Sequence, residues 1–344
     1  MSDAPRAASF DSLRGFAALL IGIQLCAEIL VFHAADYDVT SWPRVLVYDF
    51  SLTNAGIPIF FLISGYFIPA SFLGPIRVFV VGRFFRLYPV FLAAGLLALV
   101  LLPFENTAIG AYGILRSFVL MDPIAPATPF AHIHWMLMVL LGFYAICITV
   151  ALLGQVHSRL YPTVAIALLL IALGGMIIVG HLYHRHFPIA VVLALMLAHL
   201  GWLTAQLRAE PDPATSARQL WLLLLLTGAI MLICRFAWST AWGAGELWIG
   251  KAAGYALAIA LFVACAFGRL PTARVLTLFG ALSYPLFFFL PLILSFAASQ
   301  MMELPYQRRV LPLLAAVAAA FLLAALARRF IELPLAHWRR GRVP

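Results

Sequence analysis

Long apolar stretches recur along the whole chain and are separated by short polar segments. A helix needs about 20 consecutive apolar residues to cross the hydrocarbon core of a bilayer. Stretches of this kind predict about ten membrane-spanning helices, and because the apolar runs are continuous rather than alternating, they are not typical of a transmembrane barrel. The predicted spans cover residues 15–33, 47–70, 84–103, 134–153, 162–180, 187–206, 219–236, 250–267, 276–297 and 310–327.

The composition excludes a water-soluble enzyme. Of the 344 residues, 65% are hydrophobic and 10% are charged, whereas a soluble domain is about 45–50% apolar and about 25% charged. A globular core could not hide so much apolar surface at this length. We therefore expect an all-α, polytopic integral membrane protein, with residues 1–344 forming a single transmembrane domain and with no bound metal.

The distribution of basic residues predicts the orientation of the spans. The chain has 22 arginines and lysines against 13 acidic residues, and Lys251 is its one lysine. If the predicted spans alternate in direction, 15 of the 22 basic residues fall on the side that holds both termini. The positive-inside rule then predicts that both termini are cytoplasmic. We expect no nucleic-acid partner, because the arginines punctuate apolar spans and form no basic patch interleaved with exposed aromatic residues.

The first span contains ionisable residues that lipid does not tolerate without a reason. Arg14 begins the span, and Glu28 follows 14 residues later. On a regular helix the two residues lie about 40° apart around the axis and about 21 Å apart along it, so they share a face. His33 lies about 28 Å from Arg14, near the external end of the same span. Glu28 is either a functional group or a structural hydrogen-bond partner, and His33 is either a base or an interfacial residue.

A second group of arginines precedes and begins the third span. Arg83 and Arg86 are three residues apart, so they share one helix face. Together with Arg14 and Arg77 they could form a cytoplasmic cluster that binds phosphate groups, which arginine contacts through two nitrogens at once. The alternative is that each arginine only anchors its helix at the membrane surface.

Polar and aromatic residues gather on the predicted external side. Polar groups beside aromatic rings are suited to a sugar, and we expect Asp36, His134 and Trp135 to contact such a ligand. The alternative is the belt of tryptophan and tyrosine that occurs at any membrane interface. The whole set on this side consists of Asp36, Asp38, Trp42, Asp49, His132, His134 and Trp135.

Six short segments, in order along the chain, resemble the motifs of one family of membrane enzymes. They are Phe10–Leu19 (FDSLRGFAAL), Pro58–Ile68 (PIFFLISGYFI), Arg83–Pro89 (RFFRLYP), Trp135–Leu137 followed by Phe143 and Tyr144, Phe279–Tyr284 (FGALSY) and Phe330–Pro334 (FIELP). Each segment is short and apolar, but the six together are specific. They resemble the membrane-bound acyltransferase-3 family, whose members use cytoplasmic acyl-CoA to acylate extracytoplasmic sugars and other acceptors.

The resemblance implies roles for particular residues. It implies that Arg14, Arg83 and Arg86 bind the phosphates of CoA, and that His33 or Glu28 accepts the proton of the acceptor hydroxyl. Three positions depart from the family pattern. Leu25 and Leu290 stand where the resemblance implies histidines, and Leu140 stands where it implies an acidic residue.

These observations lead to one expected function and two alternatives. We expect transfer of an acyl group, acetyl or succinyl, from acyl-CoA to a hydroxyl of a periplasmic exopolysaccharide, O-antigen or other glycan, in a bacterial inner membrane. Acyl-CoA is then a co-substrate and no cofactor is permanently bound. Expected partners are the glycan or lipid-linked sugar acceptor, the bilayer and polysaccharide-assembly proteins. The alternatives are a catalytically degenerate scaffold or subunit of a polysaccharide machine, and a transporter of a lipid-linked sugar or acyl donor.

Overall fold

A computed structural model describes most of the chain. The described residues are 4–32, 45–101, 131–158, 160–184, 187–209, 225–230, 232–233, 235–236, 248–301, 304 and 306–340.

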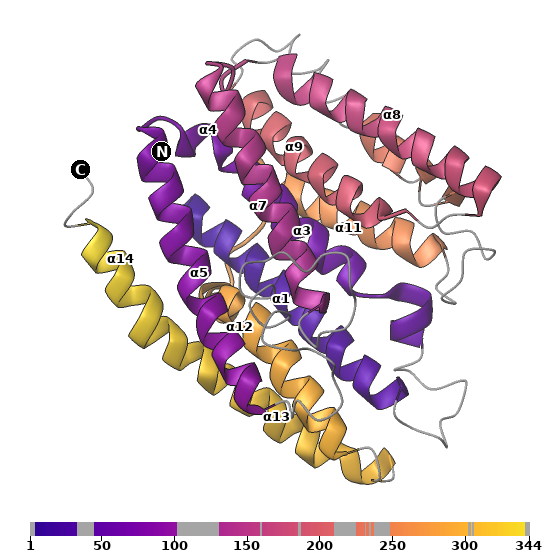
Figure 1. Cartoon of the computed structure of the whole chain (residues 1–344), viewed down its shortest axis with the longest axis vertical. Coiled ribbons are helices and arrows are strands. Elements are labelled where there is room, and N and C mark those ends of the chain that lie inside the picture. The colour runs from indigo at the N-terminus through magenta and orange to yellow at the C-terminus, as the bar shows by residue number, and fades with distance from the viewer. Residues whose placement is uncertain are drawn as a thin grey trace. The chain divides into compact units, whose positions relative to one another are not determined.

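Every regular element in these residues is a helix (Figure 1). This confirms the all-α prediction for the described part of the chain. In chain order the elements are α1 (Ala4–Phe32), η1 (Val45–Phe50), α3 (Thr53–Tyr66), α4 (Ile68–Ser71), α5 (Ile76–Leu101), α7 (Ala131–Leu152), α8 (Leu160–Tyr183), α9 (Ile189–Ala209), α11 (Trp248–Ala266), α12 (Arg274–Gln300), α13 (Tyr306–Ala327), η4 (Arg328–Glu332) and α14 (Leu333–Arg340).

Eight of the described helices are long and apolar enough to cross a membrane. They correspond to eight of the predicted spans, the last of which continues through η4 and α14 to Trp338. The predicted span 47–70 is divided among η1, α3 and α4, and α3 has only 14 residues. Only part of the predicted span 219–236 lies in the described residues.

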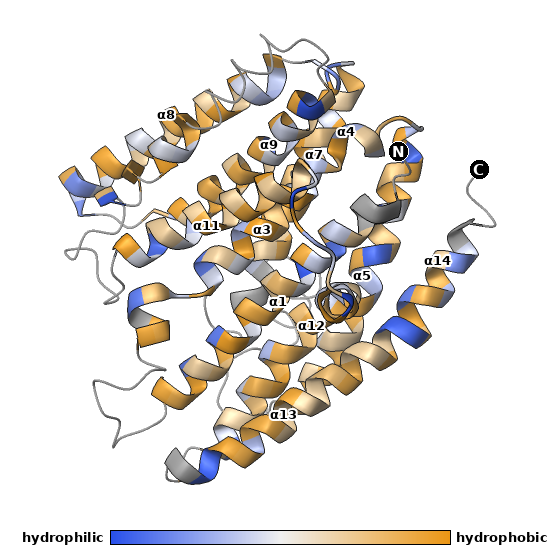
Figure 2. Cartoon of the chain, turned by 180° about the vertical axis from the view of Figure 1, so that it is seen from behind, coloured by the Kyte–Doolittle hydropathy of each residue, from blue (hydrophilic) through white to orange (hydrophobic). Residues whose placement is uncertain are grey.

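The surfaces of the long helices are those expected of a protein in lipid. Hydrophobic residues cover most of each long helix, and hydrophilic residues lie mainly toward the helix ends (Figure 2). On α8, the side chains of Leu168 and Ile171 are 61% and 72% exposed. Hydrocarbon is the natural solvent for such residues, because lipid tails are as apolar as the side chains themselves.

The chain divides into two compact units. Unit 1 comprises residues 1–24, 40–73 and 142–280, and unit 2 comprises residues 25–39, 74–141 and 281–344. Helices α1, α7 and α12 each contribute one part to unit 1 and the other part to unit 2.

Unit 1 is held together by close helix contacts at glycines. A side chain at Gly65 of α3 would collide with the carbonyl of Ala198 in α9, and one at Gly201 of α9 would collide with the carbonyl of Leu62. Small residues let backbones approach closely, which is how helices associate in lipid, where apolar side chains gain little from leaving their solvent.

Unit 2 has an apolar core in which α1, α12 and α13 take part. Leu294 of α12 and Ala320 of α13 are 1% and 0% exposed, and Leu30 of α1 is buried with them. Leu290 belongs to the same cluster, and Leu25 packs against it.

Candidate functional site

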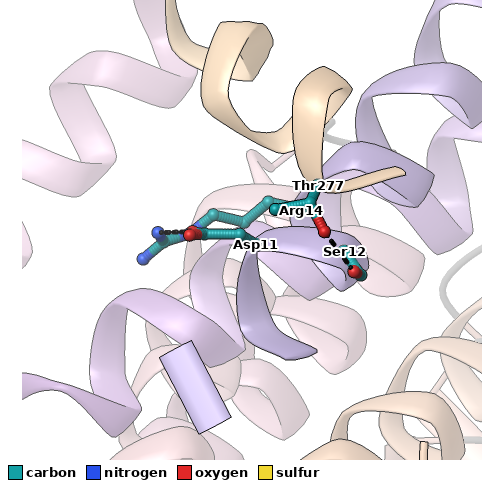
Figure 3. Close-up of polar contacts among 4 residues, drawn as sticks. All are labelled: Asp11, Ser12, Arg14 and Thr277. Atoms are coloured by element: carbon teal, nitrogen blue, oxygen red, sulfur yellow. Dashed lines mark hydrogen bonds and ion pairs between the residues drawn. The ribbon is translucent and has the colours of Figure 1, made fainter. Parts of the chain in front are cut away.

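An ion pair fixes the arginine at the start of α1. The Nη1 atom of Arg14 lies 3.0 Å from an Asp11 carboxylate oxygen, three residues earlier on the same helix (Figure 3). Residues three apart lie on one helix face, so the sequence spacing alone brings the two side chains together. The side chains are 20% and 39% exposed, respectively. The pair therefore stays in reach of solvent and of a ligand.

Polar contacts join this end of α1 to the beginning of α12. The Ser12 hydroxyl lies 2.9 Å from the Thr277 hydroxyl and accepts a hydrogen bond of 3.3 Å from the backbone N–H of Ala273 (Figure 3). The Ala273 donor precedes α12, where backbone N–H groups lack partners within the helix. Close approach requires glycines here, because a side chain at Gly15 or Gly280 would collide with the opposite backbone.

Aromatic rings surround the same end of α1. Phe10 packs against Tyr66 and Phe67, with ring centroids 4.8 Å and 5.1 Å away, and also contacts Phe262 of α11. The guanidinium of Arg14 lies 5.6 Å from the centroid of Phe67. A cation at this distance from a ring is attracted to its face, which holds the arginine in a second way.

Arg208, at the end of α9, joins this aromatic cluster. Its Nη1 atom donates to the Tyr66 hydroxyl at 3.1 Å and to the backbone carbonyl of Ala266, the last residue of α11. From the sequence alone, Arg208 is one of the 15 basic residues on the predicted side of the two termini. Its partners are 142 and 58 residues away along the chain, so no local pattern could have indicated them.

The other two predicted phosphate ligands lie on α5 in unit 2. Arg83 is half-buried, with its guanidinium 5.3 Å from the Phe79 ring centroid. Arg86 is exposed and interacts electrostatically with Glu332, as does Arg328. Arg14 belongs to unit 1, so a joint cluster of Arg14 with Arg83 and Arg86 stays a prediction.

A hydrogen bond ties a family-like motif on α12 to α5. The Tyr284 hydroxyl donates a hydrogen bond of 3.0 Å to the backbone carbonyl of Leu87, and Tyr284 also packs edge-to-face on Phe288. Leu87 directly follows Arg86 on α5. This bond therefore fixes the stretch of α5 that carries the two arginines.

The part of α1 that carries Glu28, a predicted proton acceptor, combines a half-buried carboxyl group with apolar packing. Glu28 is half-buried on this helix, which runs unbroken from Ala4 to Phe32. Leu25 and Leu290, the two positions where the resemblance implies histidines, belong to the apolar cluster of unit 2. Leu140, in place of the implied acidic residue, is half-buried on α7.

Some of the predicted site lies outside the described residues. His33 and Asp36 are both in this category. His134 lies on α7, but its side chain is not among those described, whereas Trp135 is half-buried on the same helix. The predicted roles of these four residues are untested by the geometry.

A buried histidine on α9 was not predicted. His199 is 2% exposed, and its Nδ1 atom lies 2.8 Å from the carbonyl of Leu195. A carbonyl only accepts, so Nδ1 is the donor, and Nε2 of a neutral ring then accepts from the Tyr161 hydroxyl at 3.1 Å. An ionisable residue inside an apolar span was the available signal. Because both ring nitrogens are bonded, His199 reads as a packed structural residue.

Comparison with known proteins identifies the family. A family model described as an acyltransferase domain, that of the acyltransferase-3 family, matches residues 7–329. No curated protein and no solved structure matches the chain. The match includes the ordered Arg14 on α1, Arg83 and Arg86 of α5, and Arg208. The chain therefore belongs to the acyltransferase-3 family and is a membrane acyltransferase.

Proposed function

We propose that this protein transfers an acyl group from cytoplasmic acyl-CoA to a hydroxyl of an extracytoplasmic glycan. The acceptor is an exopolysaccharide, O-antigen or other glycan, the acyl group is acetyl or succinyl, and the membrane is the bacterial inner membrane. The observation that carries the proposal is the ordered arginine of α1. Arg14 is held by Asp11 and by the Phe67 ring, within the region that the family model matches.

The proposed reaction assigns different tasks to the two ends of α1. Arg14, with Arg83 and Arg86 of α5, binds the CoA phosphates. The acceptor hydroxyl oxygen attacks the thioester carbonyl, directly or after transfer of the acyl group to the protein, and the C–S bond breaks to release CoA. His33 or Glu28 takes the hydroxyl proton, because acyl transfer to a hydroxyl needs a proton acceptor. Since α1 is one helix, Glu28 lies about 21 Å along it from Arg14.

A second candidate function is a catalytically degenerate scaffold in polysaccharide assembly. A specific observation favours it, because both implied histidine positions are leucines in one apolar cluster. Leucine cannot accept a proton, so those two positions have no acid–base role in this chain.

An assay of CoA release separates these functions. Membranes carrying the protein are supplied with acetyl-CoA or succinyl-CoA and the glycan fraction of the same cells. We expect CoA release with acylated glycan. No release with either donor would favour the scaffold, and uptake without release would indicate a transporter.

A conservative variant tests the donor site within the same assay. Lysine keeps the charge of arginine but loses its planar fork, so Arg14→Lys should raise the KM for acyl-CoA about tenfold. Arg269→Lys is the matched control, because Arg269 is an exposed arginine of the same unit beyond the end of α11. Equal effects of the two variants would remove Arg14 from the donor site.

A further inference from the structure

Arg208 is a charged group of unit 1 that the proposed reaction leaves unused. Its Nη1 atom has two hydrogens, and both are donated, one to Tyr66 of α3 and one to the carbonyl of Ala266 in α11. Three helices of unit 1 therefore meet at this guanidinium. A side chain that is already fixed loses little further conformational freedom when a ligand binds.

The opposite edge of the same guanidinium makes no hydrogen bond within the described residues. Neither Nε nor Nη2 makes a hydrogen bond to a described residue, and neither is among the buried, unbonded side-chain nitrogens of the described residues. The N–H groups of Nε and Nη2 point the same way along one edge of the planar group. That edge binds two oxygens of one phosphate or carboxylate at once.

The charge of Arg208 is uncompensated by any acidic side chain in the described part of the chain. Arg208 is also half-buried. Partial removal of a cation from water costs free energy unless an anion accompanies it. An oriented fork with an unmatched charge therefore fits an anion with two adjacent oxygens.

Arg14 contacts the same aromatic cluster, which includes Tyr66 and Phe67. Its guanidinium lies over Phe67, the Phe67 ring packs edge-to-face on Tyr66 at 5.4 Å, and Tyr66 accepts the bond from Arg208. Both arginines lie near the buried side chain of Cys265. Two guanidinium groups thus share one neighbourhood, and Arg14 has Asp11 as a carboxylate partner, whereas Arg208 has none in the described residues.

We propose that the Nε–Nη2 edge of Arg208 binds a phosphate group of the acyl-CoA donor beside Arg14. This inference rests on the proposed function for the identity of the donor. The chemistry that Arg208 recognises is phosphate, and the headgroup of an anionic lipid offers the same chemistry. The experiment therefore separates these two sources.

The test measures ligand affinity in the full-length protein, reconstituted in phosphatidylcholine nanodiscs. The probes are CoA, dephospho-CoA, pantetheine and pyrophosphate, each titrated calorimetrically. We expect Arg208→Gln to weaken CoA binding about 10- to 100-fold, because a charged, bidentate contact is lost. Pantetheine carries no CoA phosphate, so its affinity should not change. A general folding defect would weaken both ligands and would not produce this difference.

Further variants keep the test valid if Arg208→Gln does not fold. Arg208→Lys retains the charge and should weaken CoA binding less than glutamine does. Tyr66→Phe removes one bond that holds Nη1 and leaves the Nε–Nη2 edge intact, so CoA binding should weaken about two- to fivefold. Arg269→Gln should bind CoA as the parent protein does.

The possible results have distinct meanings. Equal CoA affinity in the parent and the Arg208 variants overturns the inference and leaves the proposed donor standing. Arg208-dependent binding of pyrophosphate without binding of CoA supports the phosphate site and refutes the proposed donor. If Arg208→Gln changes only the amount of phosphatidylglycerol that co-purifies with the protein, the phosphate belongs to a lipid and the donor assignment is overturned.

Discussion

The first helix takes part in two regions with opposite chemistry. At its start, Asp11, Ser12 and Arg14 make charged and hydroxyl contacts within unit 1. Eleven residues beyond Arg14, Leu25 packs against an entirely apolar cluster of unit 2. The start of α1 thus keeps oriented polar groups, whereas the level at which the resemblance implies imidazole chemistry is a hydrocarbon contact.

This difference shows that the side chain at one position of a membrane helix decides whether acid–base chemistry is available there. A polar group at the aqueous end can be paired or hydrated, but one within the bilayer needs a specific partner. Replacing an intramembrane histidine by leucine removes that requirement together with the proton acceptor. Glu28 is then the one carboxylate between Arg14 and Phe32 that can supply acid–base chemistry.

The largest effect is expected where the polar end is packed most closely. Gly280→Leu should abolish the folded protein, because any side chain there meets the carbonyl of Asp11. Overpacking typically costs about 1–3 kcal/mol, and a collision with backbone costs more. The yield of monodisperse protein in size-exclusion chromatography measures the outcome. Gly174→Leu on α8 is the control, since nothing lies within 4 Å of a side chain there. Equal yields would show that the two helices can separate without consequence.

The next largest effect concerns the proton acceptor at the apolar end. General-base catalysis contributes about 10²- to 10⁴-fold to a rate, so loss of the base should lower kcat by that factor. We favour His33 as the base and Glu28 as its partner, because a neutral imidazole accepts a proton near neutral pH. His33→Ala and Glu28→Gln are compared for glycan acylation in membranes with matched expression. Loss with Glu28→Gln alone would transfer the role to Glu28. Full activity in both variants would show that neither residue is the proton acceptor.

A smaller effect tests whether the apolar cluster tolerates the implied imidazoles. Leu290→His should lower the free energy of unfolding by about 1–3 kcal/mol, because the imidazole is buried in the apolar cluster without a hydrogen-bond partner. Leu290→Met, which conserves volume, should cost less than about 1.5 kcal/mol. Adding Leu25→His should offset part of the loss, with a coupling of about 0.5–3 kcal/mol if the rings bond. Thermal melting of the parent, the Leu290→Met, Leu290→His and Leu25→His variants and the double variant measures these differences. Strict additivity of the two histidine substitutions would mean that the two positions do not interact.

The smallest effect is expected at the hydroxyl that joins α1 to α12. Ser12→Ala removes the contact with Thr277 and the acceptor of the Ala273 N–H, and should cost about 0.5–1.5 kcal/mol. Ser299→Ala is the control, because the Ser299 hydroxyl is exposed and bonds only within its own stretch of α12. Melting temperatures that fall equally in both variants would show that Ser12 has no special role in joining the helices.

The hydropathy pattern alone predicts a chain of membrane-spanning helices, and its short motifs indicate the family. That inference succeeds because each span must satisfy its own backbone hydrogen bonds, so a run of about 20 apolar residues is sufficient evidence of a helix. The Asp11–Arg14 pair was equally local, since a spacing of three residues places both on one face. The division of the predicted span 47–70 into several helices is harder to predict from the sequence. Asn54 and Pro58 weaken the helix pattern there, but they do not indicate where one helix ends and the next begins.

The contacts between distant residues become visible only in the folded chain. Arg208 is bonded to Tyr66 and Ala266, and Leu25 joins the cluster of Leu290, across separations that hydropathy does not encode. In lipid, the partner of a helix is selected by close backbone contacts at glycines and by a few polar bonds rather than by hydrophobicity. Those contacts depend on the shapes of two helix surfaces at once. They orient the guanidinium of Arg208, which the charge pattern alone would place only as an anchor at the membrane surface.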